Sequence, residues 1–153
     1  MKSNRGFSLL ELLIVVAIIL IIATIAIPSL LRSRQAANES AAVANLRTIN
    51  TAEVTYLSSA GGNYGSVSDL VTAGLLDTRF TSGNSVSGFN FTITMTTADY
   101  TATAIPTSAN SGRYAYYTLP DAVIRYSSAT DATHCGGTGG NCFPGTMSGQ
   151  PVQ

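Results

Sequence analysis

Charged residues are scarce in this chain of 153 residues. They make up 10% of it, and eight Lys and Arg residues balance eight Asp and Glu residues. A protein that neutralises several nucleic-acid phosphates needs a field of basic side chains. The composition therefore argues against nucleic acid as a main partner.

Residue types for catalysis and metal binding are also few. The chain has one histidine, His134, and two cysteines, whereas a structural zinc site takes four ligands. The acidic residues are scattered, and no phosphate-binding glycine motif follows a predicted strand. We therefore expect no enzyme, no cofactor and no metal site.

Hydrophobic residues are abundant instead, at 45%, and they concentrate near the N-terminus. Leu12 to Ile27 is a run of sixteen residues in which Thr24 is the single polar member. Counted from Phe7, the apolar stretch has 21 residues. As a helix it would be about 31 Å long, enough to cross a hydrocarbon core of about 30 Å. The segment therefore predicts a membrane-spanning helix.

The basic residues around this segment neither identify it as a secretory signal peptide nor give its orientation in the membrane. Lys2 and Arg5 match the start of a secretory signal peptide, but the apolar core of such a peptide usually has about 7 to 15 residues and ends at a small-residue cleavage site. Arg32 and Arg34 follow the segment. Two basic residues thus lie on each side, and the positive-inside rule gives no orientation.

Glu11 is an acidic residue inside this apolar helix. A carboxylate at the bilayer centre costs about 2.5 to 3.5 kcal/mol on insertion scales, so a functional role is one explanation. The other is purely structural. Near the helix end the side chain can reach the interface and interact with the positive end of the helix dipole.

The string Arg5-Gly6-Phe7-Ser8-Leu9-Leu10-Glu11, followed by LLIVVAIILIIATIAIP, resembles the class III signal of type IV pilins and pseudopilins. In that family a prepilin peptidase cleaves after the glycine, here Gly6, and methylates the new N-terminal residue, here Phe7. By position, Glu11 is the fifth residue of the mature chain. Pro28 matches the helix-kinking proline of the family.

Cleavage at Gly6 would remove Lys2 and Arg5 and leave a free amine on Phe7. That amine is a cation at membrane depth, and a carboxylate in a neighbouring helix could neutralise it. The hypothesis is that Glu11 of one subunit pairs with the Phe7 amine of another during assembly.

The helix is expected to continue past Pro28, although a proline can also end a helix. Ser29 to Ser59 contains no Gly or Pro and is rich in helix-forming residues. We therefore predict one helix from Phe7 to about Ser59. Its second half should be covered along a narrow stripe made by Val43, Leu46, Val54 and Leu57, which Asn50 interrupts and which Arg47 and Glu53 border.

The rest of the chain predicts a small head. Ser66 to Val71 resembles a capped helical turn, and residues 89–97 alternate strictly, with Phe89, Phe91, Ile93 and Met95 on one face. Further strands are predicted at 100–105, 113–118 and 122–126. The predicted fold is α+β, a long N-terminal helix packed against a small antiparallel meander, which is also the fold that the resemblance implies.

Cys135 and Cys142 enclose six residues, four of them glycine. Such a flexible loop favours a disulfide. A disulfide requires an oxidising compartment, which places the C-terminus outside the cytoplasm. The predicted topology is single-pass, N-in and C-out.

The expected organisation has four parts: a leader at 1–6, a membrane and filament-core half-helix at 7–28, an amphipathic half-helix at 29–59, and the head at 60–153. The resemblance implies a homo-oligomeric helical filament on the bacterial cell surface. It also implies an inner-membrane precursor that is processed by prepilin peptidase and extracted by an assembly platform with an ATPase. The filament could serve adhesion, twitching motility or DNA uptake.

Two other functions stay open at this point. One is the major pseudopilin of a type II secretion system, which shares the leader and the helix. That group typically has a calcium site with clustered acidic residues near the C-terminus, whereas here that region has only Asp121 and Asp131. The other is a monomeric, membrane-anchored binding domain, which predicts no filament.

Overall fold

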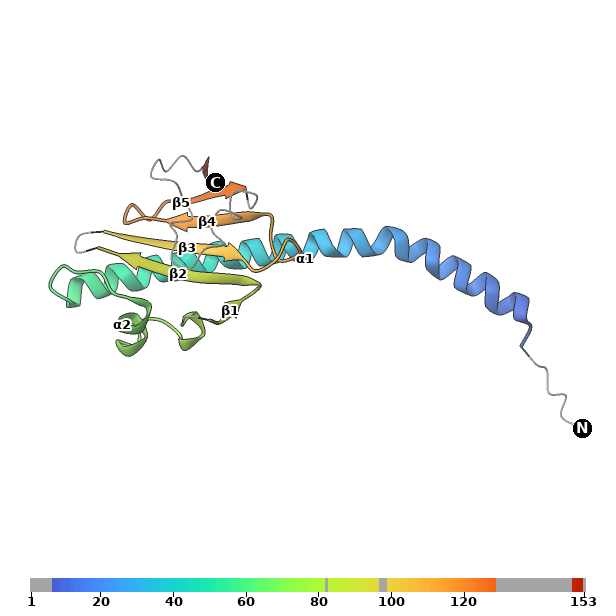
Figure 1. Cartoon of the computed structure of the whole chain (residues 1–153), viewed down its shortest axis with the longest axis horizontal. Coiled ribbons are helices and arrows are strands. Elements are labelled where there is room, and N and C mark those ends of the chain that lie inside the picture. Colours follow the sequence, from blue (N-terminus) through green and yellow to red (C-terminus); the bar gives the residue numbers. More distant parts are fainter. Residues whose placement is uncertain (1–6, 82, 97–98, 129–149, 153) are drawn as a thin grey trace, which may run out of the picture. The chain divides into compact units, whose positions relative to one another are not determined.

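The computed structural model describes residues 7–81, 83–96, 99–128 and 150–152 (Figure 1). The chain divides into two compact units, Met1–Arg34, called unit 1, and Gln35–Gln153, called unit 2. Helix α1, Leu9–Ser59, contributes residues to both. The predicted parts, a leader at 1–6, half-helices at 7–28 and 29–59 and a head at 60–153, stay predictions.

Helix α1 continues through Pro28, as the sequence predicts. It starts two residues later than expected, at Leu9. At the other end Gly61 has a φ of 67°, in the left-handed region, and the N–H of Gly62 donates to the carbonyl of Leu57 at 3.1 Å. This glycine end is a common way to satisfy the last carbonyls of a helix. The bend expected at Pro28 remains a prediction.

The strands of unit 2 form one antiparallel sheet in sequence order (Figure 1). Its four longer strands confirm the predicted meander, because each follows its neighbour through a short connection. Two flanking strands of two residues each were not predicted. The strands are β1 Ser85–Val86, β2 Phe89–Met95, β3 Tyr100–Pro106, β4 Tyr114–Thr118, β5 Ile124–Ser128 and β6 Gln150–Pro151.

Two short helices connect α1 to the sheet. Helix α2, Val67–Thr72, is the predicted capped turn: the Asp69 N–H donates to Ser66 Oγ, and the Ser66 N–H donates to the Asp69 carboxylate. This reciprocal pair is a capping box. A 3₁₀ turn, Thr78–Phe80, follows and places Phe80 against Phe91 with ring centroids 5.3 Å apart.

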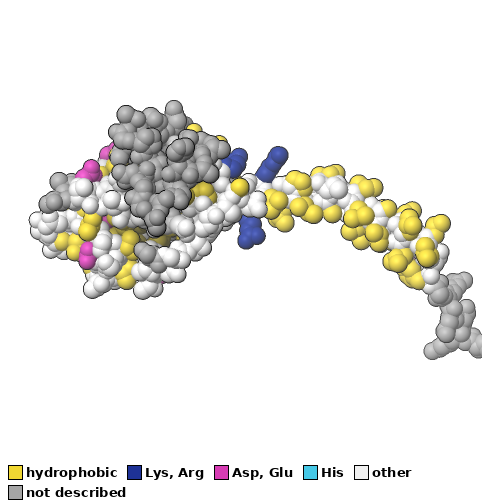
Figure 2. Space-filling view, viewed as in Figure 1, with side chains coloured by type: hydrophobic (Ala, Val, Ile, Leu, Met, Phe, Trp, Pro, Cys, Tyr) yellow, Lys and Arg dark blue, Asp and Glu magenta, His cyan; other side chains and the backbone are white. Residues whose placement is uncertain are grey.

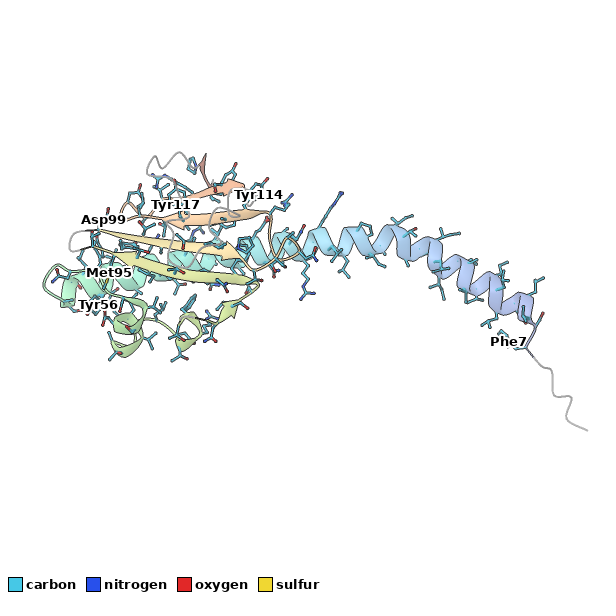
Figure 3. All side chains as sticks on the ribbon, in the orientation of Figure 1. Phe7, Tyr56, Met95, Asp99, Tyr114 and Tyr117 are labelled. Carbon is cyan, nitrogen blue, oxygen red and sulfur yellow. The ribbon has the colours of Figure 1, made fainter. Side chains whose placement is uncertain are left out.

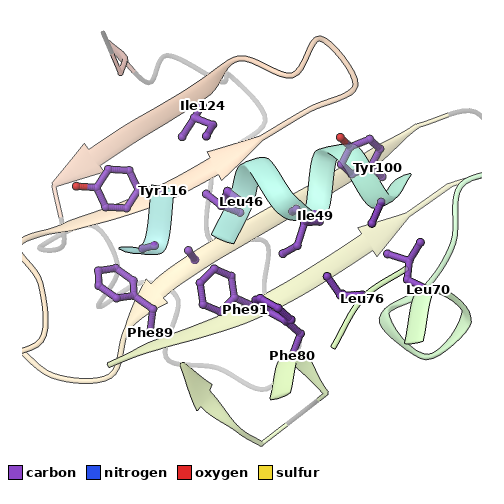
Figure 4. Close-up of a cluster of buried hydrophobic side chains, with 14 residues drawn as sticks. Leu46, Ile49, Leu70, Leu76, Phe80, Phe89, Phe91, Tyr100, Tyr116 and Ile124 are labelled. Carbon is purple, nitrogen blue, oxygen red and sulfur yellow. The ribbon is translucent and has the colours of Figure 1, made fainter. Parts of the chain in front are cut away.

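The core of unit 2 lies between α1 and one face of the sheet (Figure 4). Leu46 and Ile49 of α1 are 0% and 1% exposed and point toward the strands. Aromatic and small side chains of the sheet face them. These include Phe89, Phe91, Tyr100, Ala102, Ala104, Tyr116 and Ile124.

The predicted stripe on α1 is wrong at Val54, which is 56% exposed. The residues that α1 buries are Glu39, Ala42, Asn45, Leu46, Ile49, Asn50, Ala52 and Glu53. At 100° per residue, the centre of this face is displaced by roughly 80° from the predicted stripe. The stripe was predicted from apolar residues alone, whereas the sheet covers polar residues as well.

Met95 also differs from its prediction. It alternates with Phe89, Phe91 and Ile93 but is 42% exposed. Figure 3 shows it next to the β2–β3 turn, near Asp99. The alternating face of β2 is therefore buried at its start and exposed at its end.

Candidate functional site

Unit 1 exposes the large apolar side chains along its helix, and Figure 2 shows those on the face in view. The exposed fraction of its large hydrophobic residues runs from 43% at Leu31 to 80% at Leu9. Helix α1 is long and apolar enough to cross a membrane, with a mean hydropathy of 3.1 in its most apolar window and no residue of that window buried. Such a surface is unstable in water and has to be covered by lipid or by other apolar helices.

Glu11 lies in the first turn of α1 and is exposed. Its backbone N–H donates to the Ser8 carbonyl at 3.1 Å. Its carboxylate forms no ion pair within the part of the chain that the structure describes. A charge in this position is therefore available to a partner outside its own subunit.

Thr24 provides a contrast within the same apolar segment. Its hydroxyl donates to the carbonyl of Ile21, three residues earlier, at 2.7 Å. This polar group is satisfied by its own helix and needs no other partner. Among the polar side chains of the predicted span, Glu11 is the charged one, and an assembly partner would have to satisfy it.

The other sites predicted at the N-terminus and in the cysteine loop are only partly within the described residues. Phe7 is described and is 78% exposed, two residues before α1 begins (Figure 3). Gly6, Cys135 and Cys142 lie outside the described residues. Their predicted roles as cleavage site and disulfide therefore stay predictions.

Polar contacts that the sequence pattern does not indicate attach the loop between β3 and β4 to the part of α1 in unit 2. Glu39 is 7% exposed, and its carboxylate accepts the backbone N–H of Arg113 at 2.7 Å and pairs with the Arg113 guanidinium at 3.3 Å. Asn38 donates to the Ser111 carbonyl at 3.1 Å and Gln35 donates to that of Ala109 at 2.7 Å. These contacts hold the loop between β3 and β4 on the helix.

Asn50 links α1 to the middle of the sheet. Its side-chain amide donates to the Thr118 hydroxyl at 2.9 Å, and its carbonyl accepts the Tyr100 hydroxyl at 2.8 Å. Tyr100 and Thr118 are 2% and 0% exposed. All three polar groups are thus satisfied inside the core, as buried polar groups must be.

Glu53 is fully buried, one turn beyond Asn50. One carboxylate oxygen accepts the Gly65 N–H at 3.0 Å, and the other, Oε1, has no hydrogen-bond partner among the described residues. Burial raises the pKa of Glu53 above its ordinary value of 4.5, the Gly65 hydrogen bond opposes this shift, and the negative charge of Asp69 adds to it. The charged form of Glu53 is therefore poorly stabilised in the folded head.

Replacing Glu53 by glutamine should make folding less sensitive to pH. Because the pKa of Glu53 is raised in the folded state, its contribution to stability is present below pH 4.5 and is lost as the pH rises through the folded-state pKa. We expect Glu53→Gln to be about 1–2 kcal/mol more stable than wild type at pH 8 and similar at pH 4. Thermal unfolding of the detergent-solubilised chain at both pH values measures the difference.

Glu39→Gln is the matched control, because it is the same change on the same helix at a carboxylate that has partners. It should lower stability at pH 8 by about 1–2 kcal/mol. A Glu53→Gln chain that is less stable than wild type at pH 8 would contradict the interpretation of Glu53.

No three His, Cys, Asp or Glu side chains among the described residues lie close enough together to hold an ion. The features that the structure brings together are an exposed apolar helix with one carboxylate and a head attached to the same helix by polar contacts. The fold itself, a long N-terminal helix packed on an antiparallel sheet, is pilin-like.

Comparison with known proteins leads to the same class. A family described as "Prokaryotic N-terminal methylation motif" matches residues 1–27. The type IV major pilin protein PilA of Myxococcus xanthus is 47% identical over 55 residues, which are 36% of this chain and 25% of that protein. The type IV wide pilus major component PilA4 of Thermus thermophilus is 50% identical over 46 residues, which are 30% of this chain and 35% of that protein. No solved structure matches.

Over about a third of its length the chain is therefore similar to type IV pilins, and its residues 1–27 match the N-terminal methylation motif. The chain covers a quarter to about a third of the length of these two relatives. The activity and partners of the whole protein are therefore taken up as proposals.

Proposed function

We propose that this chain is the structural subunit of an extracellular type IV pilus-like filament. The proposal rests on the half-helix of unit 1. Its large apolar side chains are exposed, and its one carboxylate, Glu11, has no ion-pair partner among the described residues. In a filament core the apolar surfaces of neighbouring helices cover one another. Polymerisation would therefore bury the apolar surface that the isolated subunit exposes and give the Glu11 carboxylate a partner.

In this proposal the precursor is inserted in the inner membrane, with its N-terminus in the cytoplasm and its C-terminus outside. Prepilin peptidase removes residues 1–6 by cleaving after Gly6 and methylates Phe7. An inner-membrane assembly platform with an ATPase then extracts the mature chain. Extraction from lipid is costly unless the apolar surface is buried at once, so it has to be coupled to packing between subunits.

Glu11 is proposed to set the axial position of each new subunit. A carboxylate and an amine that are both removed from water are far less costly as a pair than alone. The Phe7 amine of one subunit and Glu11 of its neighbour form such a pair when the two helices are offset along the filament. Residues 7–28 would then form the filament core and residues 60–153 its surface. Pro28 would kink the helix between them.

The test combines electron microscopy of fibres sheared from cells with mass spectrometry of the protein in them. We expect long fibres made of this chain, a mature N-terminus at Phe7 that carries one extra methyl group, and a mass lower by two hydrogens for the Cys135–Cys142 disulfide. A chain that keeps residues 1–6 and forms no fibres would overturn the proposal. Free thiols in mature fibres would overturn the disulfide alone.

A further inference from the structure

Two arginines mark the end of the apolar surface of unit 1. Arg32 follows Leu31 directly on α1, Arg34 comes two residues later, and both side chains are exposed. At 100° per residue their side chains leave the helix about 200° apart, on opposite sides. In Figure 2 the apolar surface ends where basic side chains begin.

Neither arginine has an anionic partner within the described part of its own chain. The positions three and four residues away on the helix carry no acid; they are Pro28, Ser29, Leu30, Leu31, Gln35, Ala36, Ala37 and Asn38. The next carboxylate along the helix, Glu39, is paired with Arg113. Glu11 is 21 residues before Arg32, or about 31 Å along the helix.

The spacing of the arginines fits the depth of a lipid phosphate. Leu9 to Leu31 is 23 residues, or about 34 Å of helix, slightly more than a hydrocarbon core of about 30 Å. With the first turn at one interface, the arginines reach the headgroups at the other. A guanidinium donates two parallel hydrogen bonds to a phosphate and keeps its charge at any physiological pH.

We propose that Arg32 and Arg34 bind the phosphates of anionic phospholipids in the outer leaflet of the inner membrane and fix the depth of α1 before assembly. The inference rests on the proposed membrane precursor. Because the two side chains leave opposite sides of the helix, lipids on both sides are held and the helix cannot sink or tilt freely. Leaving the membrane then requires these phosphate contacts to break.

The absence of tryptophan from the chain allows a direct test. A single tryptophan placed by Leu30→Trp, next to the arginines, reports which lipids lie around this part of the helix. The full-length chain is reconstituted in vesicles of equal parts phosphatidylglycerol and phosphatidylcholine, with bromine on the chains of one or the other lipid. We expect phosphatidylglycerol to quench the tryptophan with an apparent preference of about five-fold.

The preference should fall to about one in Arg32→Gln/Arg34→Gln. The control is Arg47→Gln/Arg79→Gln, which removes the same charge from exposed arginines of unit 2 and should keep the preference. Equal quenching by both lipids in the parent chain, as expected if acidic residues of another copy neutralise the arginines, would overturn the inference. So would a preference that survives in Arg32→Gln/Arg34→Gln.

Failure of the membrane topology gives a different result. A tryptophan that neither brominated lipid quenches shows that the helix is not in the bilayer, which contradicts the proposed precursor as well as this inference. Quenching by both lipids without preference leaves the precursor standing and rejects only the role of the arginines.

Discussion

Replacing Glu11 by alanine is expected to abolish filaments while leaving membrane insertion and leader cleavage intact. Insertion should be retained, because Glu11 lies in the first turn of α1, near the interface, and its removal takes nothing from the apolar span. Assembly should fail because the Phe7 amine of the neighbouring subunit would be buried without a counter-charge, at a cost of about 3–5 kcal/mol for the broken pair. Electron microscopy of sheared surface material, with immunoblots of the membrane fraction, separates the two steps.

Thr24→Ala is the matched control for this experiment, because it removes another polar side chain from the predicted span. The Thr24 hydroxyl is already bonded to its own helix, so its loss should not change the number of filaments. Normal filaments from the Glu11→Ala chain would reject the pairing of Glu11 with Phe7. Loss of the protein from the membrane would show instead that Glu11 acts in insertion.

The second large effect is expected in the core of unit 2. Leu46→Ala should destabilise the head by about 3 kcal/mol, or roughly 10 °C in melting temperature, because Leu46 is 0% exposed and its truncation leaves a cavity under the sheet. Val54→Ala should change stability by less than about 0.5 kcal/mol, since Val54 is 56% exposed. Thermal unfolding of the detergent-solubilised chain, followed by near-ultraviolet circular dichroism, measures both.

This pair decides which face of α1 the sheet covers. Both residues belong to the stripe that the sequence predicts, and the structure buries one and exposes the other. Equal losses of stability in the two variants would support the predicted stripe and contradict the packing of α1 on the sheet.

The large features of the fold were predictable because each has a strong local signal. The apolar run and the absence of Gly and Pro from residues 29–59 predict the long helix. Strict alternation in β2 and the capping pair Ser66 and Asp69 predict their elements in the same way. Strands β1 and β6 were missed because two residues carry no periodicity, and their pairing depends on neighbours in space.

The buried polar residues of α1 could not be identified from hydrophobicity. Every hydrophobicity scale assigns Asn50 and Glu53 to an exposed face, because both side chains are polar. Their burial depends on Tyr100, Thr118 and Gly65, which come from distant parts of the chain. One signal was present in the sequence, since Ala42, Leu46, Ile49 and Glu53 repeat at intervals of three and four. A pattern that accepts a buried glutamate would therefore have predicted this face of the helix.

At the N-terminus the sequence motif predicts more about the site than the structure of a single chain can show. The succession Gly6, Phe7 and Glu11 predicts processing and pairing that involve an enzyme and a second subunit. A single chain shows Glu11 exposed and unpaired among the described residues, which agrees with those predictions without testing them. Under the proposed function, the partner of this site belongs to a neighbouring subunit.

The hydrogen bonds of Asn50 have a consequence for how the head is oriented about the helix. Sliding α1 by one residue moves it about 1.5 Å and turns it by about 100°. Either neighbour of Asn50, the apolar Ile49 or the shorter Thr51, would then stand opposite the buried hydroxyls of Tyr100 and Thr118, and at least one of these would lose its partner. The angular setting of the head on residues 35–59 of α1 is therefore fixed by these two buried hydroxyls.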